Sequence, residues 1–162
     1  VPLFKNSGIP LIVNEHLELA LRHPGLGLHL GQDDMPIPDA RRQLGPDRIL
    51  GLSTHSLPQA EEAIRLAGDL TYFCVGPVYA TGTKPEYEAV GPELVRSVAA
   101  LNPPLPFFAI GGVNSQTLDT VLEAGADRVC VVSEPLQASD TAATIRETRA
   151  RIPQPPKPDV GP

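Results

Sequence analysis

Six short apolar runs recur along the chain, and the segments between them carry the signals of helices. The runs are rich in β-branched residues, and none of them alternates polar with apolar positions. Strands that are apolar on both faces and linked by helices are typical of a parallel sheet built from βαβ units. We therefore expect strands at residues 9–14, 26–31, 49–55, 71–79, 107–113 and 128–133.

Helix start signals stand in the segments between these runs. Ser56 with Gln59 forms a capping box before one helix. Pro92 stands where the first turn of another helix would begin. Asn114 or Ser115 is suited to cap a third helix. These signals support the alternation of strands and helices.

The chain also repeats a short unit. Residues 62–69 and 121–127 each run from a helix end through a glycine into the next expected strand. No G-x-G-x-x-G follows the first strand, so an α/β fold of the TIM (β/α)8 barrel class is favoured over a doubly wound sheet. A closed barrel needs eight strands, so we expect six of the eight βα units here and two N-terminal units outside this sequence. The edges of an open arc would favour association into a homo-oligomer.

We expect one domain over residues 1–152, the N-terminally incomplete barrel. Half of residues 153–162 are proline, which cannot extend a helix, so this segment is expected to be a disordered tail. No apolar run approaches the roughly 18 to 20 residues that span a bilayer. The first residues also lack the layout of a signal peptide, which makes a cytoplasmic protein the expectation.

Composition and charge narrow the classes of partner that this protein can bind. With 41% hydrophobic and 20% charged residues, the chain fits a soluble globular domain. Its net charge of -6 argues against nonspecific binding to nucleic acid or to an anionic membrane. Cys74 and Cys130 each lie inside an apolar run, which predicts packed core thiols and neither a disulfide framework nor a zinc site.

In a TIM barrel the working residues lie at the carboxyl ends of the strands. Gly111 and Gly112 precede a helix cap there, which would leave backbone N–H groups bare for an anion, and Ser133 adds a hydroxyl at the next strand end. A tight turn would explain the glycine pair equally well. For His29 and His55 we expect structural hydrogen bonds in preference to catalysis.

Further polar residues fall at the same expected edge. Glu15 and Asp34 follow separate strands and would give hard oxygen ligands for Mg²⁺, although either alone could be a solvated loop carboxylate. Lys84, with Thr81 and Thr83 before it, could bring one cation and two hydroxyls to a phosphate. In isolation Lys84 is an exposed lysine.

Taken together, these segments resemble the thiamine-phosphate synthase family, in the family's order and near its spacing, over residues 9 to about 150. The resemblance implies a Mg²⁺-dependent transferase of small-molecule substrates. It would join 4-amino-2-methyl-5-hydroxymethylpyrimidine diphosphate to thiazole phosphate, releasing diphosphate and forming thiamine phosphate. The motifs that carry the resemblance are residues 13–15, 29–34, 51–56, 75–84, 109–113 and 129–133.

The resemblance also implies roles on the diphosphate side. Asn14 would contact the diphosphate, Glu15 and Asp34 would hold Mg²⁺, and Ser53 would lie near the diphosphate and the pyrimidine. Lys84 would contact the diphosphate, and Lys84 with Ser53 would assist catalysis. The family usually has Asp at position 15, and its Gln-x-Arg-x-Lys strand would lie before Val1.

On the thiazole side, the resemblance implies that Thr81 and Thr83 bind near the thiazole phosphate. Gly112, Val132 and Ser133 would complete a phosphate cup with N–H and hydroxyl donors. This agrees with the anion site expected from the backbone alone.

Two alternatives remain open at this point. A sister family of TenI-like thiazole tautomerases shares the barrel, but a proton-transferring histidine there replaces the proline found here as Pro77. Pro77 and the intact loop of Thr81, Thr83 and Lys84 favour the synthase. The other alternative is an inactive truncated barrel that only binds a phosphate compound.

If Lys84 contacts the departing diphosphate, Lys84→Ala should lower turnover strongly, because a preorganised charge contact at a transition state is lost. The melting temperature should stay nearly unchanged, since the side chain is expected to be exposed. Steady-state kinetics and thermal unfolding check this. A large loss of melting temperature with normal turnover would contradict the role.

Overall fold

The computed structural model describes residues 7–82 and 87–153. Over these residues, six strands form one sheet in which every neighbouring pair is parallel and the spatial order equals the sequence order. All six lie within the expected runs, and β6 is the shortest. The strands are β1 (Leu11–Asn14), β2 (Leu26–Leu30), β3 (Leu50–Thr54), β4 (Tyr72–Val75), β5 (Phe107–Ile110) and β6 (Val129–Cys130).

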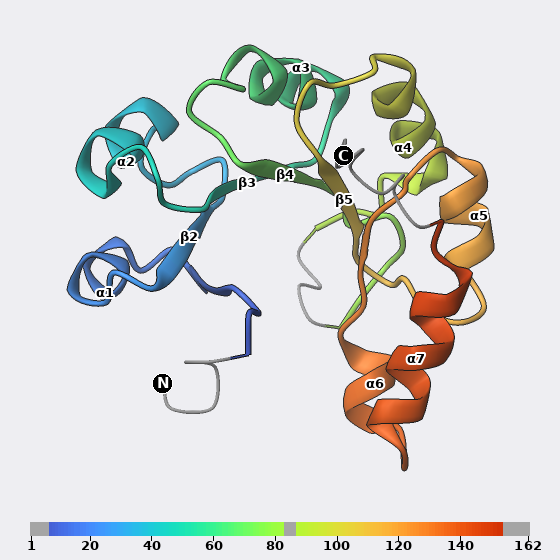
Figure 1. The fold of residues 1–162 in the computed structure, drawn as a ribbon. Helices are drawn as coiled ribbons and strands as arrows, with labels where there is room; N and C mark the ends of the chain where they lie inside the picture. Colours follow the sequence, from blue (N-terminus) through green and yellow to red (C-terminus); the bar gives the residue numbers. More distant parts are fainter. Residues whose placement is uncertain (1–6, 83–86, 154–162) are drawn as a thin grey trace, which may run out of the picture.

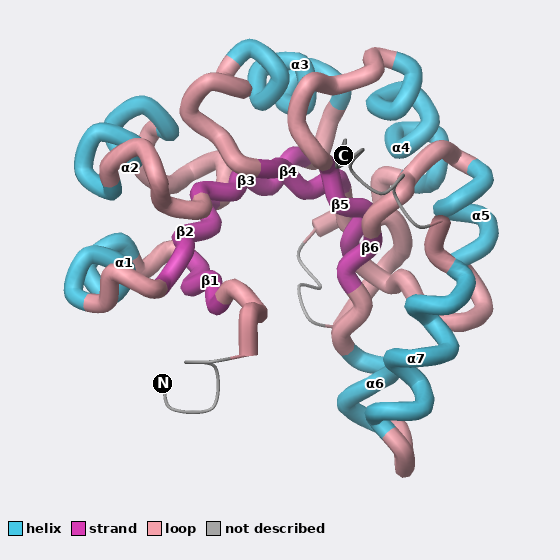
Figure 2. The backbone as a smooth tube through the Cα atoms, in the orientation of Figure 1, coloured by secondary structure: helices cyan, strands magenta, loops and turns pink. Residues whose placement is uncertain are grey.

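The sheet curves into an arc with β1 and β6 at its two ends. Helices α1 to α5 lie around its outer side, and α6 and α7 lie beyond β6 (Figures 1 and 2). A helix follows each strand, so the observed fold is a half-barrel of six βα units. The helices are α1 (Leu17–Arg22), α2 (Ile37–Leu44), α3 (Leu57–Arg65), α4 (Gly91–Ala100), α5 (Leu118–Glu123), α6 (Ser133–Gln137) and α7 (Thr141–Arg151).

The expected cap of α3 is present with one change of partner, whereas Asn114 closes the turn before α5 and Thr117 takes the N-cap position of that helix. The Ser56 hydroxyl accepts a hydrogen bond from the Gln59 N–H at 3.4 Å, at the start of α3. The Gln59 side chain accepts from the His55 N–H at 2.7 Å, one residue before the position that a capping box uses. Asn114 Oδ1 accepts from the Gln116 N–H at 2.9 Å in the turn before α5. Local side-chain chemistry therefore caps α3 and shapes the turn that precedes α5.

The two faces of the sheet have different surroundings, because side chains alternate along a strand. On the convex face, Leu28, Leu50, Phe73, Val75 and Ala109 are all 0% exposed beneath the helices. On the concave face the side chains are mostly half-buried and include polar groups. The core therefore lies between the sheet and the helices, and the concave face carries His29, Ser53, Tyr72, Phe108, Ile110 and Cys130.

The two cysteines lie on this concave side and are both free thiols. Cys74 is buried as expected, and burial, followed by the charge of Cys130, raises its pKa to about 12. Cys130 differs from the expectation of a packed core thiol, because β6 ends the arc and leaves it half-buried. Burial raises the pKa of Cys130 as well, so both thiols stay protonated at neutral pH.

Three expectations fall on segments outside the described residues: the tail after Pro153, Thr83 and Lys84. Within residues 7–82 and 87–153, no helix combines the length and apolar character needed to cross a membrane.

Candidate active site

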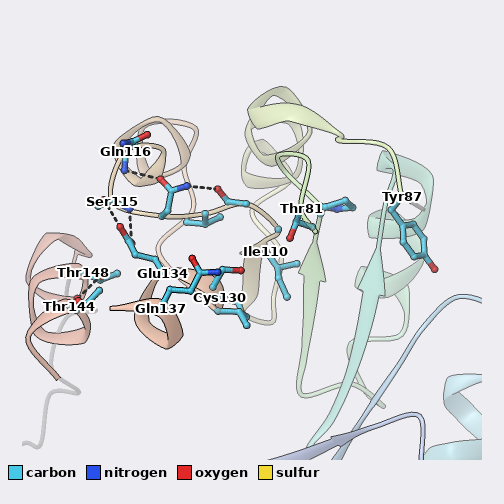
Figure 3. Close-up of a pocket in the computed structure, with 18 of the residues that line it drawn as sticks. Thr81, Tyr87, Ile110, Ser115, Gln116, Cys130, Glu134, Gln137, Thr144 and Thr148 are labelled. Atoms are coloured by element: carbon cyan, nitrogen blue, oxygen red, sulfur yellow. Dashed lines mark hydrogen bonds between the residues drawn. The ribbon is translucent and has the colours of Figure 1, made fainter. Parts of the chain in front are cut away.

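A cavity of about 820 Å³ lies at the carboxyl ends of the strands. Its wall begins at Asn14, where β1 ends, and continues through the ends of β3, β4 and β5 to the start of α6. Residues of α7 line its far side, opposite Thr81 and Tyr87 (Figure 3). The parallel sheet therefore brings loops that are distant in sequence around one hollow.

All six of the described residues that the sequence singled out for substrate binding line this cavity. They come from the end of β1, from β3, from the loop after β4, from the loop after β5 and from the segment joining β6 to α6. They are Asn14, Ser53, Thr81, Gly112, Val132 and Ser133.

The two expected metal ligands follow neighbouring strands, but neither is among the described residues that line the cavity. Glu15 has a positive φ of 67°, its N–H donates to the His29 carbonyl at 2.8 Å, and its Oε1 accepts from Asn14 Nδ2 at 2.5 Å. Asp34 Oδ2 accepts from the Gly31 N–H at 2.6 Å. Glu15 and Asp34 therefore follow the neighbouring strands β1 and β2 at the same edge.

The described part of the chain contains no group of three or more His, Cys, Asp or Glu side chains able to hold a metal ion. A Mg²⁺ site made of two carboxylates and completed by substrate phosphate oxygens would contain two protein ligands, which is fewer than such a group of three. Each carboxylate here uses one oxygen in the hydrogen bond given above, and hard oxygen donors suit Mg²⁺. The donor chemistry fits, and the Mg²⁺ site stays a prediction.

A chain of hydrogen bonds crosses three strands at the cavity wall. His29 on β2 bonds through Nε2 to Ser53 Oγ and through Nδ1 to the Tyr72 hydroxyl, both at 2.9 Å. Burial, followed by the charges of Cys74 and Cys130, raises the pKa of Tyr72, so its phenol stays protonated at neutral pH. When that phenol donates to Nδ1, the Nε2–H faces Ser53 Oγ and fixes the orientation of this hydroxyl.

Gly51 makes this chain of hydrogen bonds sterically possible. It lies on β3 between His29 and Tyr72 in the strand register. A Cβ at position 51 would stand 2.6 Å from His29 Nδ1 and would clash with the Tyr72 ring. The missing side chain lets the imidazole and the phenol meet across β3.

The second candidate histidine also has a structural partner. His55 Nδ1 lies 2.5 Å from the Gly76 carbonyl, and its ring stacks on Tyr87 with centroids 4.6 Å apart. Both histidines thus make the expected hydrogen bonds. They also line the cavity.

The glycine pair after β5 adopts a backbone that other residues rarely use. Gly111 and Gly112 have φ values of 93° and 64°. A Cβ at Gly112 would stand 2.6 Å from Tyr79 Cβ, and one at Gly111 would clash with Pro77. The pair therefore allows both the turn and the close approach of the loop after β4.

Two backbone donors that follow the glycine pair are engaged within the protein. Ser115 donates its N–H to Glu134 Oε2 at 2.9 Å and its hydroxyl to Glu134 Oε1 at 2.5 Å. The Gln116 N–H is held by Asn114 Oδ1.

Sequence reasoning missed Glu134, Tyr72 and the role of Gly51. Only Gly51, a glycine inside an apolar strand, gave a signal, since such a glycine marks a close approach.

The half-barrel and the cavity at its carboxyl edge define an α/β protein of the kind that binds small molecules above parallel strands. A family model described as "Thiamine monophosphate synthase" matches residues 1–134. The chain belongs to this family.

Curated relatives agree with this assignment. The thiamine-phosphate synthase of Mycolicibacterium gilvum (strain PYR-GCK) is 50% identical over 135 residues, which are 83% of this chain and 56% of that protein. The thiamine-phosphate synthase of Shouchella clausii (strain KSM-K16) is 42% identical over 151 residues, 93% of this chain and 71% of that protein. The chain thus spans between half and three quarters of the length of these relatives.

A solved structure shares the architecture. The thiamine phosphate pyrophosphorylase from Pyrococcus furiosus superposes with a TM-score of 0.79 at 30% sequence identity. The match covers 92% of this chain and 70% of that chain.

Replacing Gly51 by Ala should destabilise the fold by about 1–3 kcal/mol, because the new methyl group must push His29 and Tyr72 apart. Urea denaturation of both proteins measures this difference. The matched control is Gly68→Ala, since nothing lies within 4 Å of a Cβ at that position. Equal unfolding free energies for the two variants would contradict the close approach.

Proposed function

We propose that this chain acts in the condensation of 4-amino-2-methyl-5-hydroxymethylpyrimidine diphosphate with thiazole phosphate, which yields thiamine phosphate and diphosphate. The observation that carries the proposal is the convergence of Asn14, Ser53, Thr81, Gly112 and Ser133 on one cavity. These residues come from separate βα units, so their meeting in space is independent evidence beside the family assignment.

In this proposal the pyrimidine diphosphate lies at the β1–β3 end of the cavity. The Asn14 amide offers N–H donors to the diphosphate, and the Ser53 hydroxyl lies beside it, held by His29 at 2.9 Å. Lys84 adds a cation from the loop after β4. Glu15 and Asp34 would hold a Mg²⁺ ion brought with the diphosphate. When bound, that ion supplies Lewis-acid stabilisation of the negative leaving group.

The thiazole phosphate is proposed to lie at the β5–β6 end. The backbone at Gly112 and Val132 and the hydroxyl of Ser133 line this end of the cavity. Thr81, in the loop after β4, lines the same cavity on the side across from Glu134 (Figure 3), with Thr83 following in sequence. A phosphate held there fixes the thiazole ring at a distance from its own reacting nitrogen, which turns an encounter into a positioned attack.

The proposed reaction breaks the bond between the pyrimidine methylene carbon and a diphosphate oxygen, and the diphosphate leaves with the bonding electron pair. The amino-pyrimidine delocalises the positive charge that develops on the methylene carbon. The lone pair of the thiazole nitrogen then forms the new carbon–nitrogen bond. No proton has to be removed from either reacting atom, so the side chains need only bind, orient and stabilise charge.

The same proposal includes the complete architecture and the location. We infer that the six βα units are part of a (β/α)8 barrel, supported by their parallel order and by the TM-score of 0.79 to the Pyrococcus structure. We also infer a cytoplasmic location, because both substrates are phosphorylated and do not cross a bilayer unaided.

The direct test is formation of thiamine phosphate by the purified chain, with and without Mg²⁺. We expect Mg²⁺-dependent product, and a rate about 10²-fold lower for Ser53→Ala because a preorganised donor is removed. Ser97→Ala is the matched control, since its hydroxyl bonds the Glu93 carbonyl within α4. Liquid chromatography with mass detection measures the product.

Product formation by Ser53→Ala at the rate of the parent chain would contradict the assigned site. Isomerisation of thiazole carboxylate phosphate without any thiamine phosphate would instead assign a tautomerase.

A further inference from the structure

The two loops proposed to hold the thiazole phosphate lie beyond the reach of the strand ladder. The pairing of β5 with β6 consists of Ala109 with Val129 and Ile110 with Cys130. Gly112 and Ser133 both follow the last of these pairs. Some other interaction must therefore fix the loop after β5 relative to α6.

Ser115 supplies that interaction, because its N–H, its hydroxyl and its carbonyl all form hydrogen bonds to the C-terminal helices. Its N–H and its hydroxyl both donate to the carboxylate of Glu134 on α6, at 2.9 and 2.5 Å (Figure 3). Its carbonyl accepts from Arg151 Nη1 on α7 at 2.7 Å. Arg151 also pairs with Asp119 of α5 at 2.8 Å. One residue of the loop after β5 is thus bound from both C-terminal helices.

The position of Ser115 is transmitted to the glycine of the proposed phosphate cup. The Gly112 carbonyl accepts from Thr117 Oγ1 at 3.1 Å and from Asn114 Nδ2 at 3.3 Å. Residues 112–117 are therefore closed by their own hydrogen bonds and should move as a unit. On the other side, Glu134 directly follows Ser133 in the chain. The carboxylate of Glu134 therefore connects the two halves of the proposed phosphate cup, which are the Gly112 loop and Ser133.

We propose that Glu134 is a positioning residue, whose hydrogen bonds to Ser115 hold the Gly112 loop and Ser133 at the spacing that a phosphate monoester requires. This inference rests on the proposed function, because it needs the thiazole phosphate to lie at this end of the cavity. Glu134 acts here through Ser115 and touches no reacting atom.

Because Glu134 is negatively charged, a positioning role and simple repulsion predict opposite changes in the affinity for the phosphate when Glu134 is replaced. A carboxylate at the wall of a phosphate site repels the ligand unless its structural role outweighs that repulsion. Replacement by Ala removes both the charge and the hydrogen bonds. Replacement by Gln removes the charge but keeps an oxygen that can accept from the Ser115 N–H. The two variants therefore separate positioning from repulsion.

The experiment measures the Kd of thiazole phosphate by isothermal titration calorimetry on the parent chain and its variants. We expect Glu134→Ala to raise this Kd about tenfold, and Glu134→Gln to stay within about threefold of the parent. The Kd for the pyrimidine diphosphate should not change, because its end of the cavity is untouched. Glu123→Ala is the matched control and should leave the Kd of thiazole phosphate unchanged, since Glu123 is an exposed acidic residue of α5 that is not among the described residues lining the cavity.

Ser115→Ala gives a second, milder variant. It keeps the N–H donor to Glu134 and loses only the hydroxyl, so its Kd should lie between those of the parent and Glu134→Ala. An unchanged or tighter Kd in Glu134→Ala would overturn the inference, as would a Glu134→Gln variant as weak as Glu134→Ala. Failure of the parent chain itself to bind thiazole phosphate would instead overturn the proposed phosphate end of the cavity.

Discussion

The parallel direction of all six strands is the constraint on which the site depends. Helices on the outer side of the arc connect each strand to the next (Figure 2), so every strand delivers its carboxyl end to the same edge. Asn14 at the end of β1 and Ser133 after β6 therefore line one cavity although almost the whole chain separates them. Burial of the apolar convex face under the helices stabilises this arrangement. The concave face is then available for polar groups and for ligands.

Within that frame, two small networks set the positions of functional groups. At the β1–β3 end, His29 aligns the Ser53 hydroxyl and is itself held by Tyr72 across the gap left by Gly51. At the β5–β6 end, Ser115 ties the glycine loop to the C-terminal helices. Both networks join different βα units through side chains, the first within the strand ladder and the second beyond its last pair. The proposed reaction needs two anionic substrates held in register, and such cross-unit bonds fix the distance between their binding ends.

The sequence predicted the order of strands and helices because apolar runs, caps and glycines are local signals. The Ser56 cap and the positive φ of Gly112 illustrate this, since each follows from the residue and its immediate neighbours. The sequence also predicted those residues of the cavity wall that are polar and directly follow a strand. What escaped prediction depends on contacts between units. Nothing local indicates that Glu134 meets the loop after β5, or that Tyr72 reaches past β3 to His29.

The central claim is that thiazole phosphate binds at the carboxyl edge of the sheet, between the Gly112 loop and Ser133. The most direct measurement is a titration of the isotope-labelled chain with thiazole phosphate, followed by the backbone amide shifts. We expect the largest shifts at Gly112 and Ser133. We expect none around Asn102 and Asp127, which line a smaller hollow beside the start of β5. Shifts confined to that smaller hollow, with the amides of Gly112 and Ser133 unmoved, would contradict it.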